Sequence, residues 1–336
     1  PGVNRAAVSI DRDQIHGRPY EDPAAVVSAA AAAAAPAQQE RKQALIEEFV
    51  HLGRWLAAKG YAFITSTPAT HARVMARDPW RRAGNLQDVF GWNRVFDDAL
   101  LPPKIVECMR RGGALQAVGR QWRSRVRFSS LEGSLFLHSA WPTSASDAVF
   151  FGPDTYRFAR FVRANLPATA PSGLRVCEVC CGSGAVGLIT AQCLGPETEL
   201  HLVDINPVAL TAAYVNAELA GVRKARIYIS DLLQSVQPSA DLVICNPPYL
   251  PDSAHRLYRD GGNDYGTALS LKLVQQALRH LRPGGRMLMY TGTAVIAGEP
   301  VLARRLLPLL EAAARERALR YRYEELDPDV FGEELE

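Results

Sequence analysis

The chain has 336 residues, of which 48% are hydrophobic and 22% are charged, and its formal net charge is +3. This length predicts two domains, or one large domain with an extension, and the apolar content is sufficient for a substantial core. The near balance of charges excludes a polycation, and no run approaches the roughly 18 apolar residues that a membrane span needs, so no membrane association is expected.

The first 145 residues are expected to form two parts. Residues 1 to 36 show little periodicity and contain an alanine run, which predicts a flexible arm. Residues 37 to 145 are predicted to form a helical and hairpin domain that holds a substrate or covers the site. Apolar residues recur at helical spacing between Leu45 and Leu56, and two strand-like runs follow further along. Helices followed by a hairpin predict a winged-helix-like module.

The segment from Trp80 to Arg127 (residues 80–127) is basic, with ten Lys or Arg against four Asp or Glu. Trp92 and Trp122 are interleaved with these charges, a pattern typical of a surface that binds nucleic acid. The alternative is a solvated surface over aromatic core residues. We favour this alternative, because charge runs usually do no more than face water.

The six cysteines lie in a chain whose start shows no signal peptide, so reduced thiols and a cytoplasmic location are expected. The cluster from Cys177 to Cys181 lacks the paired spacing of a zinc site. Core or loop thiols are therefore the preferred interpretation, and no metal is predicted.

From Gly173 onward, predicted strands and helices alternate. This alternation predicts an α/β fold with a doubly wound, Rossmann-like parallel sheet, and residues 146 to 336 are assigned to it as the catalytic domain. Ligands of such sheets bind outside the carboxyl ends of the strands. The motifs described next all fall at these ends.

Three polar groups follow three successive predicted strands. A glycine-rich turn with Gly182 and Gly184 comes after the first strand and opens a helix. Asp204 ends the second strand, where its carboxylate can accept both hydroxyls of a ribose. Asp231 ends the third strand and is placed to accept from the amine of an adenine, with the Leu232 amide nearby. Together these residues predict a site for one adenosine.

The glycine-rich turn also fits the dinucleotide fingerprint, which makes NAD a competing cofactor. The segment Asn246-Pro247-Pro248-Tyr249, directly after the fourth apolar strand, argues against NAD. Two prolines make this turn rigid, so the Asn246 side chain and the Pro247 carbonyl can act as two fixed acceptors for N–H groups. Tyr249 can then stack on the acceptor. A plain proline turn is the alternative interpretation.

In combination, these motifs resemble the class I methyltransferases that depend on S-adenosylmethionine (SAM). The nearest branch carries Asn-Pro-Pro-Tyr and includes release-factor glutamine methyltransferases and several rRNA and DNA amino-methyltransferases. The resemblance covers roughly residues 150 to 323 and implies SAM as the cofactor. Asn246, Pro247 and Tyr249 are the catalytic candidates. The candidates for cofactor binding are Tyr156, Glu178, Cys180, Gly182, Gly184, Asp204, Ile205, Asp231, Leu232 and Asn246.

The chain departs from the family pattern at Cys180 and in its first 140 residues. Cys180 stands where the family usually has Gly, so its side chain is expected to crowd the methionine end of SAM. Tyr156 is a candidate to cover the cofactor, with core packing as the alternative. The first 140 residues do not resemble the helical domain of the release-factor enzymes, which weakens any transfer of their substrate.

Three functions stay open at this point. The preferred one is transfer of a methyl group to a planar amide or amine nitrogen of a protein, a nucleobase or RNA, or a small molecule. The second is a SAM-consuming cyclase that forms a cyclic amino acid and releases methylthioadenosine, as azetidine-carboxylate synthases do. Cys180 and the unfamiliar N-terminal module motivate it. The third is a SAM-sensing module that binds nucleic acid through the basic segment.

Overall fold

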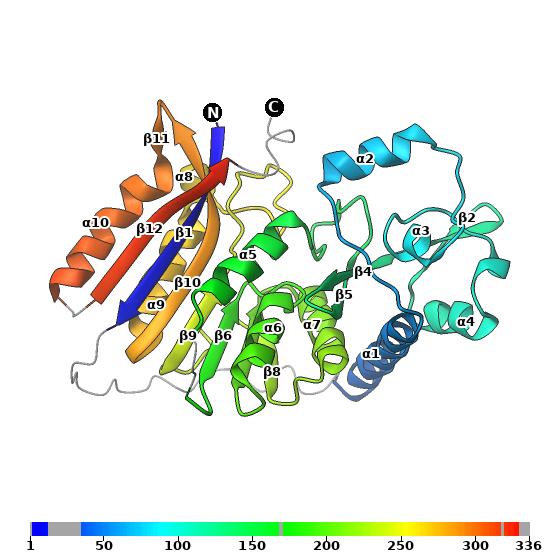
Figure 1. The fold of residues 1–336 in the computed structure, drawn as a ribbon, viewed down its shortest axis with the longest axis horizontal. Coiled ribbons are helices and arrows are strands. Elements are labelled where there is room, and N and C mark those ends of the chain that lie inside the picture. Colours follow the sequence, from blue (N-terminus) through cyan, green and yellow to red (C-terminus); the bar gives the residue numbers. More distant parts are fainter. Residues whose placement is uncertain (1, 13–34, 168–170, 317–318, 329–336) are drawn as a thin grey trace.

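The computed structural model describes residues 2–12, 35–167, 171–316 and 319–328. A large twisted sheet with helices on both faces forms one half of the molecule. Residues 35 to 139 form a second body beside it (Figure 1). The predicted α/β fold is confirmed.

The sheet is mostly parallel, and its strand order reverses between β6 and β9. The chain runs outward from β6 to β7 and β8, returns to β9 on the other side of β6, and continues to β10. This reversal is the topological switch point at which α/β sheets bind ligands. In spatial order the strands are β12 (Leu319–Pro328), β1 (Gly2–Arg12), β10 (Leu281–Ile296), β9 (Ala240–Cys245), β6 (Arg175–Val179), β7 (Glu199–Asp204) and β8 (Ala225–Ile229), with β11 (Glu299–Pro300) paired to β10.

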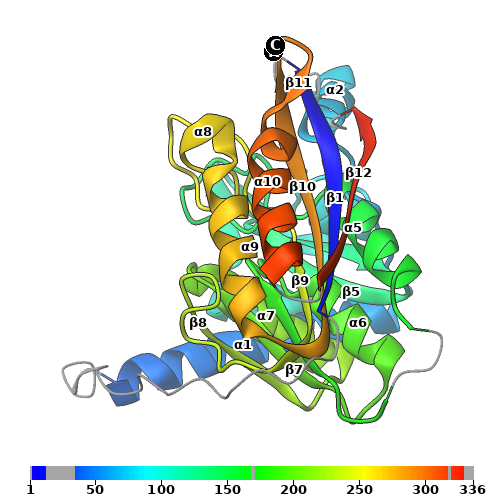
Figure 2. The same ribbon diagram turned by 90° about the vertical axis from the view of Figure 1, so that its left-hand side faces the viewer.

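Two hydrophobic cores lie on opposite faces of this sheet. Helices cover both faces (Figure 2). Successive side chains of a strand point to opposite faces, so Val176 of β6 enters one core and Cys177 enters the other. The first face is covered by α5 (Pro153–Ala164), α6 (Ala185–Leu194) and α7 (Pro207–Ala220), and the second by α9 (Ala268–His280) and α10 (Val301–Glu316); the one-turn helix α8 (Asn263–Gly266) precedes α9.

The flexible arm predicted for residues 1 to 36 is wrong for residues 2 to 12. They form β1, which runs antiparallel between β10 and β12 and pairs with both. Ala6, Ala7 and Val8 are 0–3% exposed, so consecutive residues of β1 are buried on both faces of the sheet. A strand buried on both faces lacks the polar–apolar alternation that identifies a strand in sequence. Residues 13 to 34 lie outside the described residues.

The second body contains helices and two β-hairpins, of which one hairpin was predicted. Its core continues into α7 through Ala209, Ala212 and Val215. Asn216 of α7 also accepts from the Leu137 amide at 2.7 Å, so the body is attached to the sheet by packing and by hydrogen bonds. Its elements are α1 (Ala35–Ala58), α2 (Pro68–Arg77), α3 (Leu86–Phe90), η2 (Asp98–Leu100), α4 (Pro103–Arg111), β2 (Leu115–Val118), β3 (Gln121–Ser124), β4 (Val126–Leu131) and β5 (Ser134–Ser139).

Much of the charge in the basic segment is used inside the structure. Arg94 and Arg127 are buried, at 3% and 4% exposure. Arg81, Arg82 and Arg111 form ion pairs with nearby carboxylates. These contacts favour a structural role for the segment over a nucleic-acid surface. The winged-helix-like arrangement stays a prediction.

None of the described helices combines the length and the apolar character that crossing a bilayer requires. Within the described ranges, no three His, Cys, Asp or Glu side chains are grouped so that they could hold a metal ion.

Candidate active site

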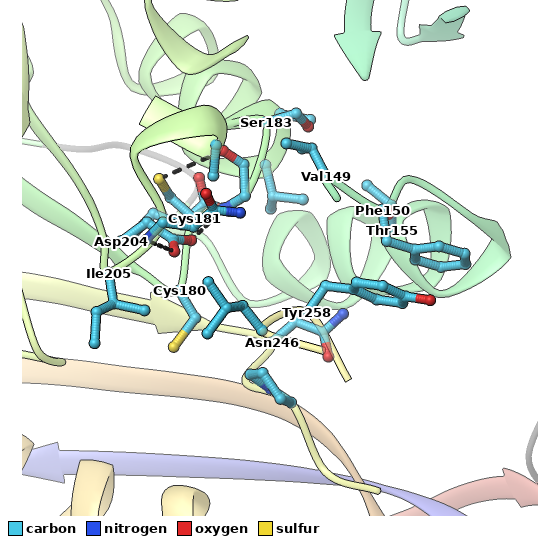
Figure 3. A pocket seen from close by; sticks show the side chains of 18 of the residues that line it. Val149, Phe150, Thr155, Cys180, Cys181, Ser183, Asp204, Ile205, Asn246 and Tyr258 are labelled. Carbon is cyan, nitrogen blue, oxygen red and sulfur yellow. Dashed lines mark hydrogen bonds between the residues drawn. The ribbon is translucent and has the colours of Figure 1, made fainter. Parts of the chain in front are cut away.

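A cavity opens at the carboxyl ends of β6, β7, β8 and β9, at the switch point of the sheet (Figure 3). We call it the first cavity. Side chains from separate strand ends meet here because parallel neighbours end at the same edge. Of the predicted cofactor-binding residues, the structure places eight in its lining: Glu178, Cys180, Gly182, Asp204, Ile205, Asp231, Leu232 and Asn246.

Asp204 is held by the backbone of the two turns that border the cavity. Its Oδ2 accepts from the Gly182 amide at 2.8 Å, and its Oδ1 accepts from the Asn206 amide at 2.9 Å. Burial raises the pKa of Asp204. Each carboxylate oxygen keeps a second lone pair, so the group can still accept from two hydroxyls. Gly184 does not line the cavity: it caps α6 at φ +71°, and a Cβ there would lie 2.8 Å from Leu202.

Cys180 occupies a backbone position that suits glycine. Its φ is +54°, in the left-handed region that costs an ordinary residue about 1–2 kcal/mol. Its side chain points toward the cavity, as Figure 3 shows. The conformation accounts for the glycine that the family usually has at this position, and Cys180 adds volume that glycine would not.

The outer part of the first cavity has the character of a nucleoside site. Ile205 is 55% exposed beside Asp204, an unusual position for an apolar side chain that has nothing to cover. Asp231 lies at the next strand end, where Lys272 and Gln234 donate to its Oδ2 at 2.8 and 2.7 Å. An apolar surface between two carboxylates fits a base and its ribose.

The charge of the lining discriminates between the two candidate cofactors. Four carboxyl side chains line the first cavity (Asp154, Glu178, Asp204 and Asp231), and none of the described residues that line it is Lys or Arg. Burial, together with the nearby Asp204, raises the pKa of Glu178 to about 8, so this group can become negative when a cation enters. Such a lining attracts a sulfonium cation and repels the pyrophosphate of NAD. The residues present therefore fit SAM.

Asn246 follows β9 and lies at the inner wall of the first cavity. Its Nδ2 donates to Oδ2 of Asp154 on α5 at 3.1 Å, while its Oδ1 is buried and has no hydrogen-bond partner among the described residues. The Asp154 oxygen accepts this hydrogen bond, so the nitrogen end of the Asn246 amide faces Asp154. The Asn246 oxygen is consequently left as a fixed acceptor.

The rest of the Asn-Pro-Pro-Tyr turn packs against the sheet. Tyr249 is 9% exposed, and the Arg5 guanidinium carbon lies 4.2 Å from its ring centroid. The ring also covers the backbone of Gly292, where a Cβ would come within 2.2 Å of Cδ2. Gly261 and Gly266 leave similar room for the Tyr249 backbone. Of the three predicted catalytic residues, Asn246 lines the first cavity, whereas Pro247 and Tyr249 do not.

A second cavity adjoins the first. Phe150, Asp154 and Tyr258 line both, and Tyr249 lines only the second. The Phe150 and Tyr258 rings stack with centroids 5.4 Å apart. The Tyr258 hydroxyl donates to the Thr143 carbonyl at 2.7 Å, which joins the loop after β9 to the segment after β5. We call this the second cavity.

The structure thus separates the predicted residues into groups. Tyr156 lines neither cavity; its ring packs on Phe151, and its hydroxyl accepts from the Thr65 amide at 3.1 Å. Asp154 and Arg5 were not singled out as candidates. Asp154 could have been found, because it lies two positions before Tyr156, which was a candidate to cover the cofactor. No sequence motif around Arg5 indicated that this residue would lie beside Tyr249.

Comparisons with known proteins agree with this geometry. The family model "Methyltransferase small domain" matches residues 158–313. A putative protein N5-glutamine methyltransferase of Methanocaldococcus jannaschii is 30% identical over 161 residues, 45% of this chain and 77% of that protein.

Two further relatives match over shorter stretches. A release factor glutamine methyltransferase of Mycolicibacterium smegmatis is 35% identical over 130 residues, 34% of this chain and 45% of that one. Ribosomal RNA small subunit methyltransferase C of Hahella chejuensis is 34% identical over 115 residues, 34% of this chain and 30% of that one. The chain thus spans less than half the length of these two relatives. The match to the Methanocaldococcus jannaschii relative covers 77% of that protein, and the sheet is Rossmann-like, so the chain belongs to the class I methyltransferases whose cofactor is SAM.

Proposed function

We propose that the protein transfers a methyl group from SAM to a planar amide or amine nitrogen. The observation that carries this proposal is the Asn246 side chain, whose nitrogen is held by Asp154 while its buried oxygen stays available at the wall of the acidic first cavity. A fixed acceptor beside a cation site is suited to holding an N–H group next to a methyl donor.

The first cavity provides the groups that would hold SAM. Asp204 would accept from the ribose hydroxyls, Asp231 from the adenine amine, and Ile205 would cover the base. When bound, SAM supplies a methyl group that its sulfonium makes electrophilic. The carboxylates of the lining would stabilise that positive charge, and Glu178 would join them by releasing the proton that burial favours. Cys180 would occupy part of the space available to the methionine end.

Asn246 Oδ1 would accept from a hydrogen of the acceptor nitrogen and direct its lone pair at the methyl carbon. The Pro247 carbonyl, which the sequence suggested as a second acceptor, belongs to a residue that lines neither cavity. The new C–N bond forms as the C–S bond breaks, and the sulfur keeps the electron pair of that bond. The nitrogen then loses a proton to water. Because the donor is already activated, the protein contributes position and electrostatic stabilisation.

The named relatives support nitrogen as the atom that receives the methyl group, since their names specify N5-glutamine and release-factor glutamine. They do not specify the acceptor of this chain, because one of them is named for ribosomal RNA. Protein, nucleobase and small-molecule acceptors are all compatible with a planar nitrogen held by Asn246.

Product analysis tests this proposal. The protein is incubated with SAM alone and with separate amide, amine, protein and RNA acceptors, and the nucleoside products are separated by chromatography. The proposal expects S-adenosylhomocysteine only when an acceptor is present. Methylthioadenosine from SAM alone would instead identify the cyclase. RNA binding that weakens with salt, without any methyl transfer, would identify the nucleic-acid module.

A further inference from the structure

The second cavity differs from the first in its charge. Arg256 and Arg259 both line it, whereas Asp154 is its single carboxyl side chain among the described residues. The buried Arg5 guanidinium adds positive charge behind the ring of Tyr249. The second cavity thus has cationic side chains that the first cavity lacks, which suggests a ligand with a negatively charged group.

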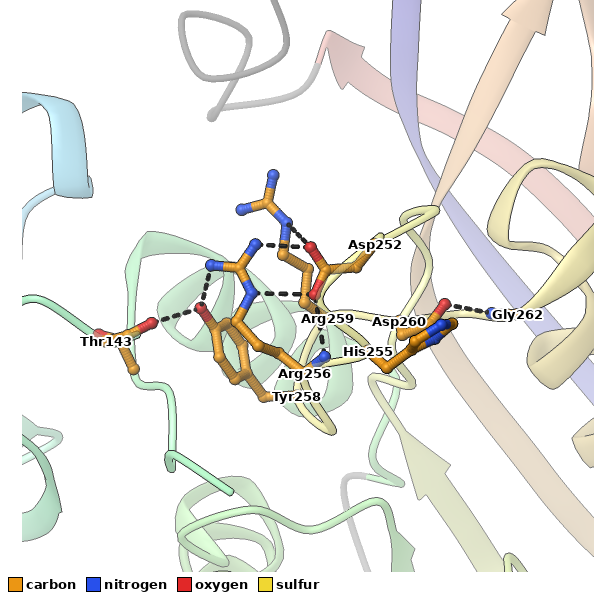
Figure 4. A network of polar contacts seen from close by, with 8 residues as sticks. All are labelled: Thr143, Asp252, His255, Arg256, Tyr258, Arg259, Asp260 and Gly262. Carbon is orange, nitrogen blue, oxygen red and sulfur yellow. Dashed lines mark hydrogen bonds and ion pairs between the residues drawn. The ribbon is translucent and has the colours of Figure 1, made fainter. Parts of the chain in front are cut away.

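The two lining arginines share one carboxylate, that of Asp252 (Figure 4). Arg256 holds it closely, with its Nη2 2.6 Å from Oδ1 and its Nε 2.9 Å from Oδ2. Arg259 is further away, with its Nε 3.8 Å from Oδ1. The Arg256 contact holds the pKa of Asp252 down at about 2, so Asp252 carries one negative charge against two positive ones.

Of the two arginines, Arg259 is the one whose guanidinium can still bind a ligand. Its Nε is buried and has no hydrogen-bond partner among the described residues. In Figure 4 its terminal nitrogens point away from Asp252. A guanidinium presents its donors as a fork that matches a carboxylate or a phosphate, and a buried donor without a partner is costly.

Apart from its charged groups, the second cavity has flat and mostly apolar walls. Trp141, Pro142 and the stacked pair of Phe150 and Tyr258 contribute to the lining. Flat apolar walls favour a planar molecule. Asp154 marks the end at which the second cavity meets the first, where the reacting nitrogen would lie.

From this arrangement we infer that the second cavity binds the methyl acceptor, and that the acceptor is a planar amide or amine carrying an oxyanion, a carboxylate or a phosphate, which pairs with Arg259. This inference rests on the proposed function and narrows its substrate class. Arg259 becomes a residue that determines specificity without touching the reacting atoms.

Matched probes test the charge requirement. In protein saturated with S-adenosylhomocysteine, calorimetry compares terephthalamide with 4-carbamoylbenzoate, which replaces one amide by a carboxylate, and with 4-carbamoylphenyl phosphate. We expect at least one charged probe to bind about tenfold more tightly than the neutral one, as one charge-assisted pair provides. The stronger of the two charged probes identifies carboxylate or phosphate as the natural group.

Two variants and a control connect the preference to Arg259. Arg259→Gln should abolish the tighter binding of the charged probe. Arg259→Lys should keep part of it, because the positive charge remains. Arg304→Gln, an exposed arginine of α10, should leave it unchanged. Equal affinity for neutral and charged probes, no binding of either charged probe, or a preference that survives Arg259→Gln would overturn the inference. The affinity for S-adenosylhomocysteine, measured in the same samples, reports separately on the first cavity, and its loss would count against the proposed function instead.

Discussion

Asp154 and Asn246 lie 92 positions apart in the chain, yet Asn246 Nδ2 donates to Asp154 Oδ2 at 3.1 Å, at the place where the two cavities meet. One is near the start of α5 and the other follows β9. The contact decides which end of the Asn246 amide faces an incoming nitrogen. A rigid proline turn alone would not decide this, because an amide can rotate by half a turn about its last bond.

Replacing Asp154 should therefore affect the reaction more than the binding of SAM. In Asp154→Asn the residue at 154 can donate as well as accept, so the Asn246 amide is no longer held in one orientation. We expect kcat to fall by about 10²-fold, similar to the loss of one oriented group in an active site. The dissociation constant of S-adenosylhomocysteine should change little. Asp98→Asn, at an exposed position, is the control, and an equal fall of kcat in that variant would contradict the assignment.

We expect that the Tyr249 ring can pack against β10 only because residue 292 is glycine. An added Cβ would come within 2.2 Å of Tyr249 Cδ2, so Gly292→Ala must displace the ring or the strand. Overpacking of this kind costs roughly 1–3 kcal/mol, which chemical denaturation can measure. Gly84→Ala is the matched control, because the nearest atom there is 3.9 Å away.

A double-mutant cycle shows whether Tyr249 causes this cost. When Tyr249→Ala is present, Gly292→Ala should destabilise the protein much less, since the clashing ring is gone. Additive losses in the double variant would mean that Gly292 is needed for another reason.

The folded protein should be less stable with cysteine at position 180 than with glycine there. Its φ of +54° strains any residue with a Cβ, so Cys180→Gly should be more stable than Cys180→Ala by about 1 kcal/mol. Comparing these two variants separates backbone strain from loss of the sulfur atom, which both lack. A greater stability of the alanine variant in thermal or chemical unfolding would show that the strain is not significant.

Glu178 predicts a pH dependence with a definite sign. Its pKa is about 8 in the folded protein and about 4.5 in an unfolded chain, because burial disfavours the charged form. The folded state keeps a proton that the unfolded state releases, so the free energy of unfolding falls as pH rises from about 4.5 to about 8. The Glu178→Gln variant has no ionisable group at this position. Its free energy of unfolding should therefore fall less over the same pH range.

The same group predicts proton release when a cation binds. A sulfonium in the first cavity favours ionised Glu178, so calorimetry of SAM binding near pH 7 should give an apparent enthalpy that depends on the ionisation enthalpy of the buffer. Glu316→Gln, an exposed position on α10, serves as the control for both experiments. Parallel stability curves for the wild type and Glu178→Gln would refute the prediction.

The sequence was sufficient to bring together Asp204, Asp231 and Asn246. Each follows an apolar strand, and parallel strands end at one edge, so a local pattern was enough to predict a shared site. For Cys180 the sequence predicted crowding of the cofactor by the side chain, but not the positive φ of its backbone, which the structure shows.

Contacts between segments that are distant in the chain could not be predicted from local sequence patterns. β1 pairs with β10 and β12 and is buried on both faces, so nothing in residues 2 to 12 indicates their partners. Arg5 reaches Tyr249 only because Arg5 and Gly292 are paired across these strands. The separation of Tyr249 from the first cavity has the same origin, because it depends on what packs beneath the turn.

The proposed role of Asn246 is to present the acceptor nitrogen to a donor held in the first cavity. Its most direct test is mass spectrometry of the products formed from SAM with a trideuterated methyl group and a small-molecule extract, with wild type and Asn246→Ala compared. We predict that the wild type yields S-adenosylhomocysteine and a product labelled on nitrogen, and that Asn246→Ala still binds the donor but yields neither. Methylthioadenosine as the main nucleoside product, or equal labelling by both proteins, would contradict the account.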